Sequence, residues 1–377
     1  MRKTLGEIFE IGSGGTPSKM HPEYYGGDIP WVKTGDLKEE YLYSIEDCIT
    51  EEGLKNSSAR IYQSGTVLIA MYGATIGATS ILKLDACTNQ ACAAFKPCKD
   101  VIPEYLYYFL RSKKQKFIND GIGGAQPNIS AGYLKKVSID IRTIDEQEKV
   151  VKVLDKLSRI VQKRQKEISE LENLLKTRFV EFYNNSPLGE ETTMEAITDR
   201  VKVGFVGTCE KFYTDDFGIP MLRTGNITDN GIDLSNLKYV TQEFHEKNKK
   251  SQIHEGDLLI ARHGSNGQAN VYYGPEAQCL NTVVIVPNYE IATSVFLAGL
   301  INSPFVKGQI ERTLVGSTQH VVNTKSIANL AVRIPNLQVQ REYETFVKQV
   351  DKSKVTVQKS LDETKKLFDS IMQEYFG

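Results

Sequence analysis

Two long stretches of the chain carry apolar residues at every third or fourth position. Residues 144–184 contain no glycine or proline, and residues 337–377 repeat the same apolar spacing. This spacing is typical of a helix that buries one face, and ~41 residues at 1.5 Å each make a helix roughly 60 Å long. The stripes are Val150, Leu154, Leu157, Val161, Ile168, Leu171, Leu175 and Phe182, with Arg164 and Arg178 at two steps, and Tyr343, Phe346, Val350, Val357, Leu361, Leu367, Ile371 and Tyr375.

Each apolar stripe needs a partner, and the nearest one is the stripe of the other long helix. We therefore expect the two helices to pack as an intramolecular antiparallel coiled coil. A helical interface with a second chain is the competing interpretation.

The segment before each long helix has a different pattern. Short β-branched or aromatic runs, such as Thr66–Tyr72 and Val137–Ile141, alternate with glycine-rich turns and predict strands. Tyr105–Phe117 and Ser294–Ile301 have helical patterns. We predict an α+β fold with globular domains at 1–143 and 185–336 and long spacer helices at 144–184 and 337–377.

The two halves of the chain are copies of one another. Trp31–Leu37 is similar to Met221–Ile227 at an offset of 190 residues, and Ser64–Ala70 matches Glu255–Ala261 one residue further on. Asn89 with Asn281, Gln126 with Gln319 and Gln147 with Gln340 continue the same order. Matches that keep their order over this distance indicate a tandem duplication.

The composition narrows the class of protein. Lys+Arg 46 against Asp+Glu 47 gives a net charge of -1, which excludes a globally basic chain that coats nucleic acid. No apolar run approaches the ~18 residues of a membrane span, and Glu7 interrupts the N-terminus before a secretory signal could form. We expect a cytoplasmic protein. The six cysteines and five histidines show no metal-ligand spacing, so we expect reduced structural thiols and no metal site.

Two segments are similar to catalytic motifs. Gly73–Thr79 has the first glycines of a phosphate loop but lacks the Gly-Lys-Ser/Thr end, so we interpret it as a turn between strands. Asn302–Phe305 is similar to the Asn-Pro-Pro-Phe of amino-methyltransferases, but the chain has no glycine-rich cofactor loop. We interpret it as a helix that stops at Pro304. The sequence therefore favours a binding or scaffold protein with no catalytic residue of its own.

The architecture and several motifs resemble the specificity subunits of type I restriction-modification systems. The resemblance covers essentially the whole chain. Its most specific elements are Gly14–Ser18, Ile29–Trp31, the strand motifs at Gly65 and Gly256, Gly123–Ser130 and Asp145–Gln147. The second copy departs from this pattern, with Leu337–Gln340 at the start of its helix and Phe205–Cys209 in place of Gly-Gly-Thr-Pro-Ser.

The resemblance implies a non-catalytic subunit that recognises a bipartite site in double-stranded DNA. In that family, two target-recognition domains each read one half-site, and two long helices separate them and dock two adenine methyltransferase subunits. The chain itself would hold no cofactor, and S-adenosylmethionine would bind to those partners. Restriction/translocase subunits join the complex. Glu146, Gln147 and Gln340 would lie in the docking surface.

The duplication separates two kinds of candidate DNA contacts. If the domains read different half-sites, shared residues cannot discriminate, so they would be scaffold, phosphate or partner contacts, and divergent loops must read the bases. The shared candidates are Lys33 with Arg223 and Thr34 with Thr224, for which a surface salt bridge is the alternative. The divergent candidates are Lys19, His21, Tyr24, Tyr25, Tyr72 and Thr75 in the first domain and Lys211, Arg262, His263, Ser265, Asn266 and Gln268 in the second.

Each divergent candidate has an ordinary alternative. The aromatic residues of the first domain could be core residues, and the loop from Arg262 to Gln268 could be a solvated polar loop. Lys113, in a cluster with Lys114 and Lys116, is a candidate for the DNA backbone, with a solvated helix face as the alternative. Two rival functions also stay open: a coiled-coil scaffold that binds only proteins, and an enzyme that uses Asn302 and Phe305.

Overall fold

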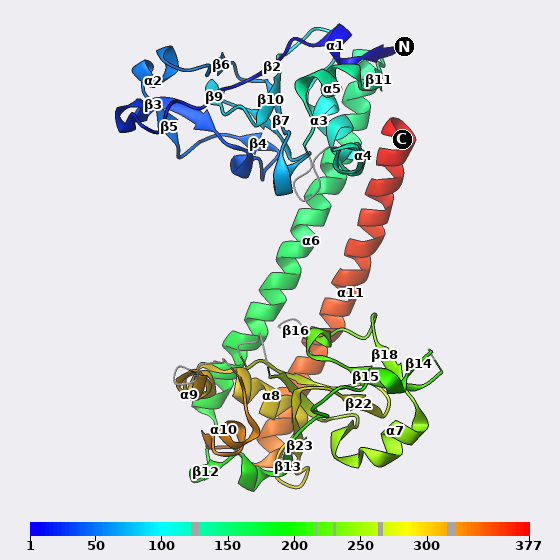
Figure 1. Cartoon of the computed structure of the whole chain (residues 1–377). Helices are drawn as coiled ribbons and strands as arrows, with labels where there is room; N and C mark the ends of the chain where they lie inside the picture. Colours follow the sequence, from blue (N-terminus) through cyan, green and yellow to red (C-terminus); the bar gives the residue numbers. More distant parts are fainter. Residues whose placement is uncertain (122–127, 216, 229–230, 263–266, 315–320) are drawn as a thin grey trace. The chain divides into compact units, whose positions relative to one another are not determined.

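The computed structural model describes residues 1–121, 128–215, 217–228, 231–262, 267–314 and 321–377. The chain forms two compact units. Unit 1 comprises Met1–Gln165 and Lys359–Gly377, and unit 2 comprises Lys166–Gln358. Both divisions fall inside long helices, α6 (Ile144–Asn185) and α11 (Leu337–Phe376), so that each unit contains one part of each helix (Figure 1).

One sheet in each unit packs against the main core. In unit 1 its order is β2-β10-β7-β8-β4, and in unit 2 the order β13-β23-β20-β21 repeats the first four strands. The apolar runs predicted strands but not their order, and their lack of polar alternation fits strands that are buried on both faces. The bounds are Ile11–Ser13 (β2), Cys92–Phe95 (β10), Val67–Ala70 (β7), Thr79–Leu82 (β8), Tyr41–Leu42 (β4), Thr198–Val203 (β13), Thr282–Pro287 (β23), Leu258–Ala261 (β20) and Ala269–Val271 (β21).

A second sheet in each unit contains a parallel strand pair. Trp31 faces Cys87 across β3 and β9, and Met221 faces Gln278 across β15 and β22. The strand orders β5-β3-β9-β6 and β18-β15-β22-β19 correspond, and β14 pairs with β18 as the first part of β3 pairs with β5. The bounds are Cys48–Ile49 (β5), Tyr25–Val32 (β3), Ala86–Thr88 (β9), Ile61–Tyr62 (β6), Lys238–Val240 (β18), Ile219–Leu222 (β15), Ala277–Cys279 (β22), Gln252–Ile253 (β19) and Tyr213–Thr214 (β14).

Short helices and strand pairs complete both units. In Figure 1, α3, α4 and α5 lie beside the start of α6, whereas α2, β3 and β5 lie on the far side of unit 1. The helices are Leu5–Ile8 (α1), Glu51–Lys55 (α2), Pro103–Ser112 (α3), Lys114–Asp120 (α4), Ala131–Lys136 (α5), Gln242–Lys247 (α7), Ser294–Asn302 (α8), Pro304–Leu314 (α9) and Thr324–Ala328 (α10). The pairs are β1 (Arg2–Thr4) with β11 (Ser138–Asp140), β12 (Thr192–Thr193) with β24 (Ala331–Val332), and β16 (Ile227–Thr228) with β17 (Gly231–Ile232).

The long helices pack against each other within each unit. In unit 1, Val150 and Leu154 of α6 share a core with Met372 and Phe376 of α11. In unit 2, the rings of Phe182 and Tyr343 lie 5.4 Å apart. The start of each helix therefore meets the end of the other, and the two run antiparallel, as the apolar pattern predicts.

The stripe prediction is wrong by one residue at the end of each helix. Phe179 and Met372 are buried where the pattern placed Arg178 and Ile371, and Leu367 is 51% exposed. An α-helix drifts ~20° per heptad from a 3.5-residue repeat, so a stripe counted in threes and fours leaves the buried face. The same shift occurs in both helices, because each end also packs against a globular domain.

The predicted α+β class and the tandem duplication are both confirmed. The predicted turn at Gly73–Thr79 lies between β7 and β8, and α8 stops before Pro304 as expected. One pairing was wrong: the backbone N–H of Asn89 donates to Val32, and the N–H that donates to the matching Leu222 is that of Leu280. Asn89 therefore corresponds to Leu280. In the described residues, no helix is long and apolar enough to cross a membrane.

Candidate nucleic-acid interface

Two buried glutamines join the long helices to the globular domains. Gln147 accepts a hydrogen bond from the backbone N–H of Ile102 at 3.0 Å and donates to the carbonyls of Asp100 and Arg142. Gln340 makes the same three bonds, from the N–H of Thr293 at 2.9 Å and to the carbonyls of Ile291 and Pro335. We call these two sets of bonds the glutamine latches.

The glutamine latches correct our docking prediction. Gln147 and Gln340 are both 0% exposed, and their amide groups bind backbone atoms of their own chain. Neither can reach a partner protein. Glu146 is exposed, and its carboxylate accepts from the N–H and hydroxyl of Thr143, both at 2.9 Å. These bonds cap α6 and lower the pKa of Glu146.

The shared turn after β3 and β15 has the same backbone in both units. The N–H of Lys33 donates to Asp36 at 2.7 Å, and the N–H of Arg223 donates to Asn226 at 2.9 Å. Thr34 and Thr224 begin these turns and are partly exposed.

The basic side chains of the shared turn have different partners. Lys33 forms an ion pair with Asp47, and this contact is the main cause of its raised pKa. Arg223 donates to the carbonyl of Asn236 at 3.3 Å. For Lys33, the structure therefore favours a surface salt bridge over a phosphate contact. The Nε of Arg223 has no hydrogen-bond partner among the described residues.

The first divergent loop of unit 1 surrounds the short helix η1 (Pro22–Tyr24). Lys19 and His21 are exposed, and His21 contacts Glu23 at 2.8 Å. Tyr24 is only 9% exposed, and its ring stacks on His21 with 4.8 Å between centroids. Tyr25 donates to the carbonyl of Pro17 at 2.5 Å. Tyr24 is thus a core residue, and Lys19 and His21 are the accessible candidates.

The other unit 1 candidates come from α3 and from the turn after β7. Tyr72 is 43% exposed, and Thr75 donates to its carbonyl at 3.2 Å. Lys113 is partly buried and donates to the carbonyl of Phe376 at the end of α11. Burial lowers the pKa of Lys113. A lysine at a helix C-terminus stabilises that end, so the structural alternative describes Lys113 better than a phosphate contact does.

The unit 2 candidates are only partly described. Lys211 is exposed and lies over the ring of Phe212, 5.0 Å from its centroid. Arg262 is partly buried, and its carbonyl accepts from the N–H of Val322 at 3.0 Å. Gln268 is partly exposed. His263, Ser265 and Asn266 lie outside the described residues.

One exposed aromatic residue was missed by our sequence reasoning. Phe217 is fully exposed between β14 and β15. The signal was present in the sequence, since Phe217 follows two aspartates and precedes a glycine in a polar turn.

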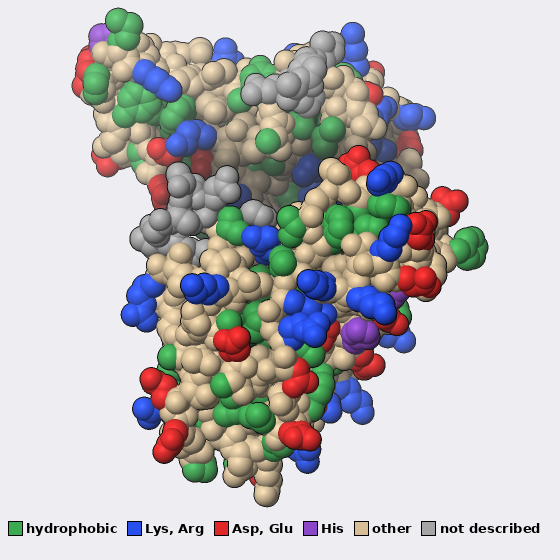
Figure 2. All heavy atoms as spheres, turned by 60° about the horizontal axis from the view of Figure 1, so that its bottom comes forward, with side chains coloured by type: hydrophobic (Ala, Val, Ile, Leu, Met, Phe, Trp, Pro, Cys, Tyr) green, Lys and Arg blue, Asp and Glu red, His purple; other side chains and the backbone are tan. Residues whose placement is uncertain are grey.

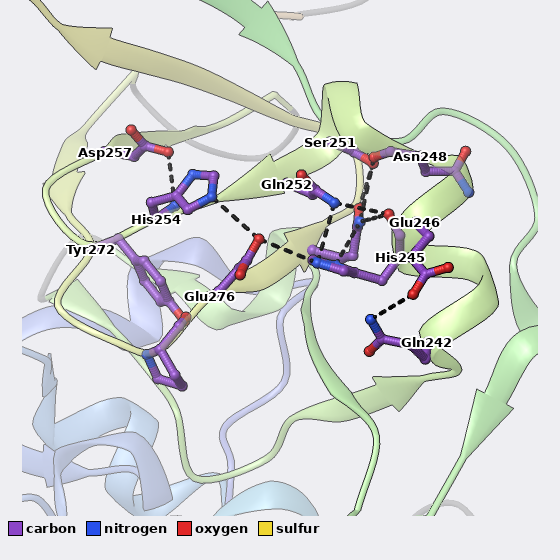
Figure 3. Close-up of polar contacts among 12 residues, drawn as sticks. Gln242, His245, Glu246, Asn248, Ser251, Gln252, His254, Asp257, Tyr272 and Glu276 are labelled. Carbon is purple, nitrogen blue, oxygen red and sulfur yellow. Dashed lines mark hydrogen bonds and ion pairs between the residues drawn. The ribbon is translucent and has the colours of Figure 1, made fainter.

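Unit 2 also contains a polar network that the sequence did not reveal (Figure 3). His245 is 6% exposed, with Gln278 Nε2 3.1 Å from its Nδ1 and Gln252 Nε2 3.2 Å from its Nε2. Glu276 lies between the two histidines, 3.3 Å from the Nε2 atoms of both His245 and His254. In unit 1 the matching residues of His245 and Gln278 are Leu54 and Cys87, which pack in an apolar cluster.

The surface charges alternate in sign on the face shown in Figure 2. Lys and Arg side chains are interspersed with Asp and Glu, and a small group of basic side chains lies beside a histidine. Among the described residues, no cluster of His, Cys, Asp and Glu could hold a metal ion. Asn302 has a structural role, because its amide pairs with both the N–H and the carbonyl of Ala269 at 2.8 Å.

Comparison with known proteins identifies similar chains. The family model described as "Type I restriction modification DNA specificity domain" matches residues 1–173 and 201–364. The chain is 26% identical over 396 residues to the type I restriction enzyme MjaIX specificity subunit of Methanocaldococcus jannaschii, covering 98% of this chain and 91% of that one. It is 30% identical over 190 residues to the EcoR124I/EcoR124II specificity subunit of Escherichia coli, covering 46% and 47%.

Solved structures show the same fold. A chain from a structure of the type I R-M system, described in terms of complex assembly and conformational transition, superposes with a TM-score of 0.61 at 16% identity. The S subunit of a type I restriction-modification system from M. genitalium superposes with a TM-score of 0.55 at 14% identity. Both cover all of this chain, and 97% and 96% of their own length.

Proposed function

Because this chain belongs to the family of type I restriction-modification DNA specificity proteins, we propose that it is the non-catalytic subunit that selects a bipartite DNA site. Each unit would read one half-site, through target-recognition domains at 1–143 and 185–336. The observation that carries the proposal is the match of the family model to both copies of the repeat, residues 1–173 and 201–364.

The pattern of conserved and changed structure between the two units supports this function. The strand orders, the turn at Lys33 and Arg223 and the glutamine latches are the same in both. On the surface, side chains differ in the loop around η1 and in the turn that contains Phe217. In the interior, they differ around His245. Two recognition surfaces on one backbone frame can read two different base sequences.

The divergent residues that are exposed or partly exposed are our candidates for base contacts. Lys19, His21, Tyr72 and Thr75 serve unit 1, and Lys211, Arg262 and Gln268 serve unit 2. An arginine suits the N7 and O6 of guanine, and a glutamine suits the N6 and N7 of adenine. His263, Ser265 and Asn266 keep the same proposed role from the sequence alone. Arg223 and Thr224, with Lys33 and Thr34, would contact phosphates.

The partners would be two adenine methyltransferase subunits, which would bind S-adenosylmethionine, together with restriction/translocase subunits. The exposed faces of α6 and α11, including Glu146, would dock them, and the two helices would fix the spacing between the half-sites. Since the chain has a net charge of -1, its own DNA affinity should be modest and salt-sensitive, and tight binding should need the methyltransferases.

The test is to express this chain together with its candidate adenine methyltransferase in a host free of DNA methylation, and to map modified adenines by long-read sequencing. We expect one motif with two defined blocks around a fixed gap. Exchange of the unit 2 loops for those of a relative should change one block only. A stable complex with the methyltransferase that modifies no defined motif would contradict DNA recognition and favour a protein-binding scaffold.

A further inference from the structure

Unit 2 contains a cavity of about 700 Å³, and Gln268, a base-contact candidate of our proposed function, lies in its wall. Its walls come from α8, α6, α11, β21 and the β16–β17 hairpin, all within unit 2. Small-molecule sites in proteins have volumes of roughly 300 to 1,000 Å³, with mostly apolar walls and a few polar groups. The size and the walls of this cavity are therefore those of a ligand site.

Comparison with unit 1 shows why the cavity exists. Tyr107 and Arg111 of α3 hold the matching positions in unit 1, where Arg111 donates to the Tyr107 hydroxyl at 2.9 Å and Tyr107 is 4% exposed. In α8 of unit 2 the corresponding residues are Ala298 and Asn302, and both line the cavity. The shorter side chains of unit 2 thus leave open a part of the space that larger ones would occupy.

Glycine at position 299 allows aromatic rings to form one wall of the cavity. The matching residue in unit 1 is Tyr108, which donates to Asp155 at 2.7 Å. In unit 2 a Cβ on residue 299 would lie 2.5 Å from the ring of Phe179, so only glycine lets this ring take its place. Phe179 and Tyr343 pack edge to face with 5.1 Å between centroids. They provide an apolar and aromatic wall for a flat ligand.

Three polar groups line the cavity, and two of them, on Tyr273 and Asp351, are exposed. Tyr343 is 5% exposed, and its hydroxyl lies beside Gly299. Neither this hydroxyl, nor that of Tyr273, nor the carboxylate of Asp351 makes a hydrogen bond or ion pair within the described parts of the chain. The charge of Asp351 helps to raise the pKa of both tyrosines. Asp351 therefore places an accessible carboxylate without an ion pair beside two hydroxyl groups in the cavity wall.

We propose that this cavity binds a small aromatic molecule that carries a positively charged amine. The ring would lie against Phe179 and Tyr343 in the space that Tyr107 occupies in unit 1, and the ammonium group would bind Asp351. Burial raises the pKa of Asp351 and the charge of Lys354 partly offsets this rise, while the Lys354 ammonium itself forms an ion pair with Glu172 at 3.0 Å. The inference concerns unit 2 alone and does not rest on DNA recognition.

The test uses three naphthalene compounds of the same size with the full-length protein. Naphthylmethylamine is cationic, naphthalenemethanol is neutral and naphthoic acid is anionic. In isothermal titration calorimetry we expect one molecule of the amine to bind per chain, about tenfold more tightly than the alcohol, which corresponds to about 1.4 kcal/mol and matches the difference between a charged and a neutral hydrogen bond. The acid should bind most weakly.

Three variants and one control separate the space in the cavity from its charge. Ala298→Tyr restores the unit 1 residue and should abolish binding of all three compounds, and Val347→Phe should do so from the opposite wall. Asp351→Asn should leave the alcohol unchanged and remove the preference for the amine. Val355→Phe is the control, because Val355 is 69% exposed on the same helix and does not line the cavity.

Several results would overturn the proposal. One is wild-type protein that binds none of the three compounds at one per chain. Another is binding that survives in both filled variants, with folding of each variant verified by thermal unfolding. A third is a preference for the amine that persists in Asp351→Asn.

Discussion

Units 1 and 2 have one backbone frame but different interiors. The strand orders correspond, and the glutamine latches reproduce three hydrogen bonds with the same donors and acceptors. Beneath the parallel strand pair, however, unit 1 packs Leu54 against Cys87, whereas unit 2 places His245 against Gln278. The duplication has kept the contacts that position the long helices, and it has changed the side chains that fill each unit.

The glutamine latches should contribute equally to the stability of both units. Their loss should have the largest effect of the changes that we predict. Replacing Gln147 or Gln340 by leucine leaves a backbone N–H and two carbonyls in partly buried positions without their partner. Each change should lower the free energy of unfolding by about 3 kcal/mol, measured by urea denaturation. Gln338→Leu, at an exposed position of the same helix, should change it little. A large effect in one unit only would contradict the equivalence.

The interior of unit 2 should be convertible to that of unit 1. His245→Leu alone removes the ring nitrogen that lies 3.1 Å from the buried Gln278 Nε2, which then keeps only longer bonds to the carbonyls of His245 and Asn248, and it should cost about 2 kcal/mol of stability. The double variant with Gln278→Cys recreates the Leu54 and Cys87 pair, and it should recover most of this loss. A double-mutant cycle by chemical denaturation measures the coupling. If the losses of stability in the two single variants simply add in the double variant, then His245 and Gln278 do not stabilise each other.

The starts of α6 and α11 should differ in their response to acid, which is the smallest effect. Hydrogen bonds from Thr143 hold the pKa of Glu146 below its ordinary value of 4.5. A group with a lowered folded pKa stabilises above its unfolded pKa, and this stabilisation is lost as the pH falls through the folded pKa. Asn336 caps α11 instead, with a 3.1 Å bond from the N–H of Val339, and does not titrate.

Hydrogen exchange between pH 6 and pH 3 measures this difference. The first turn of α6 should lose protection at the acid end more than the first turn of α11. Glu146→Gln should make the two helices alike. Equal acid sensitivity of both helices in the unmodified protein would argue against Glu146 as the cause.

The fold could be predicted from the sequence because its signals are local or repeated. The heptad stripes gave both long helices, and the duplication gave the tandem layout, which the family match confirms. The ends of the stripes could not be predicted, because Phe179 and Met372 turn toward α8 and α3 and not only toward the other helix.

The candidate sites could be predicted only in part. Gln147 and Gln340 were found from the repeat, but an exposed polar residue at a helix start and a buried one look alike in sequence. Leu54 and His245 both lie in short helices, so nothing local showed that one side chain packs in an apolar cluster and the other in a polar network. The cavity depends on Ala298 and Asn302 facing α11, a contact between residues far apart in the chain.

The path of the chain between the two units has a consequence for synthesis. Unit 1 is discontinuous: it consists of Met1–Gln165 and Lys359–Gly377, and Met372 and Phe376 belong to its core. Unit 2 is continuous in sequence. During synthesis on the ribosome, residues 1–165 therefore cannot complete their core until Lys359–Gly377 has been made, which happens after all of unit 2. The half that is translated first is the half whose core is completed last, and until then its partly formed core is open to chaperones.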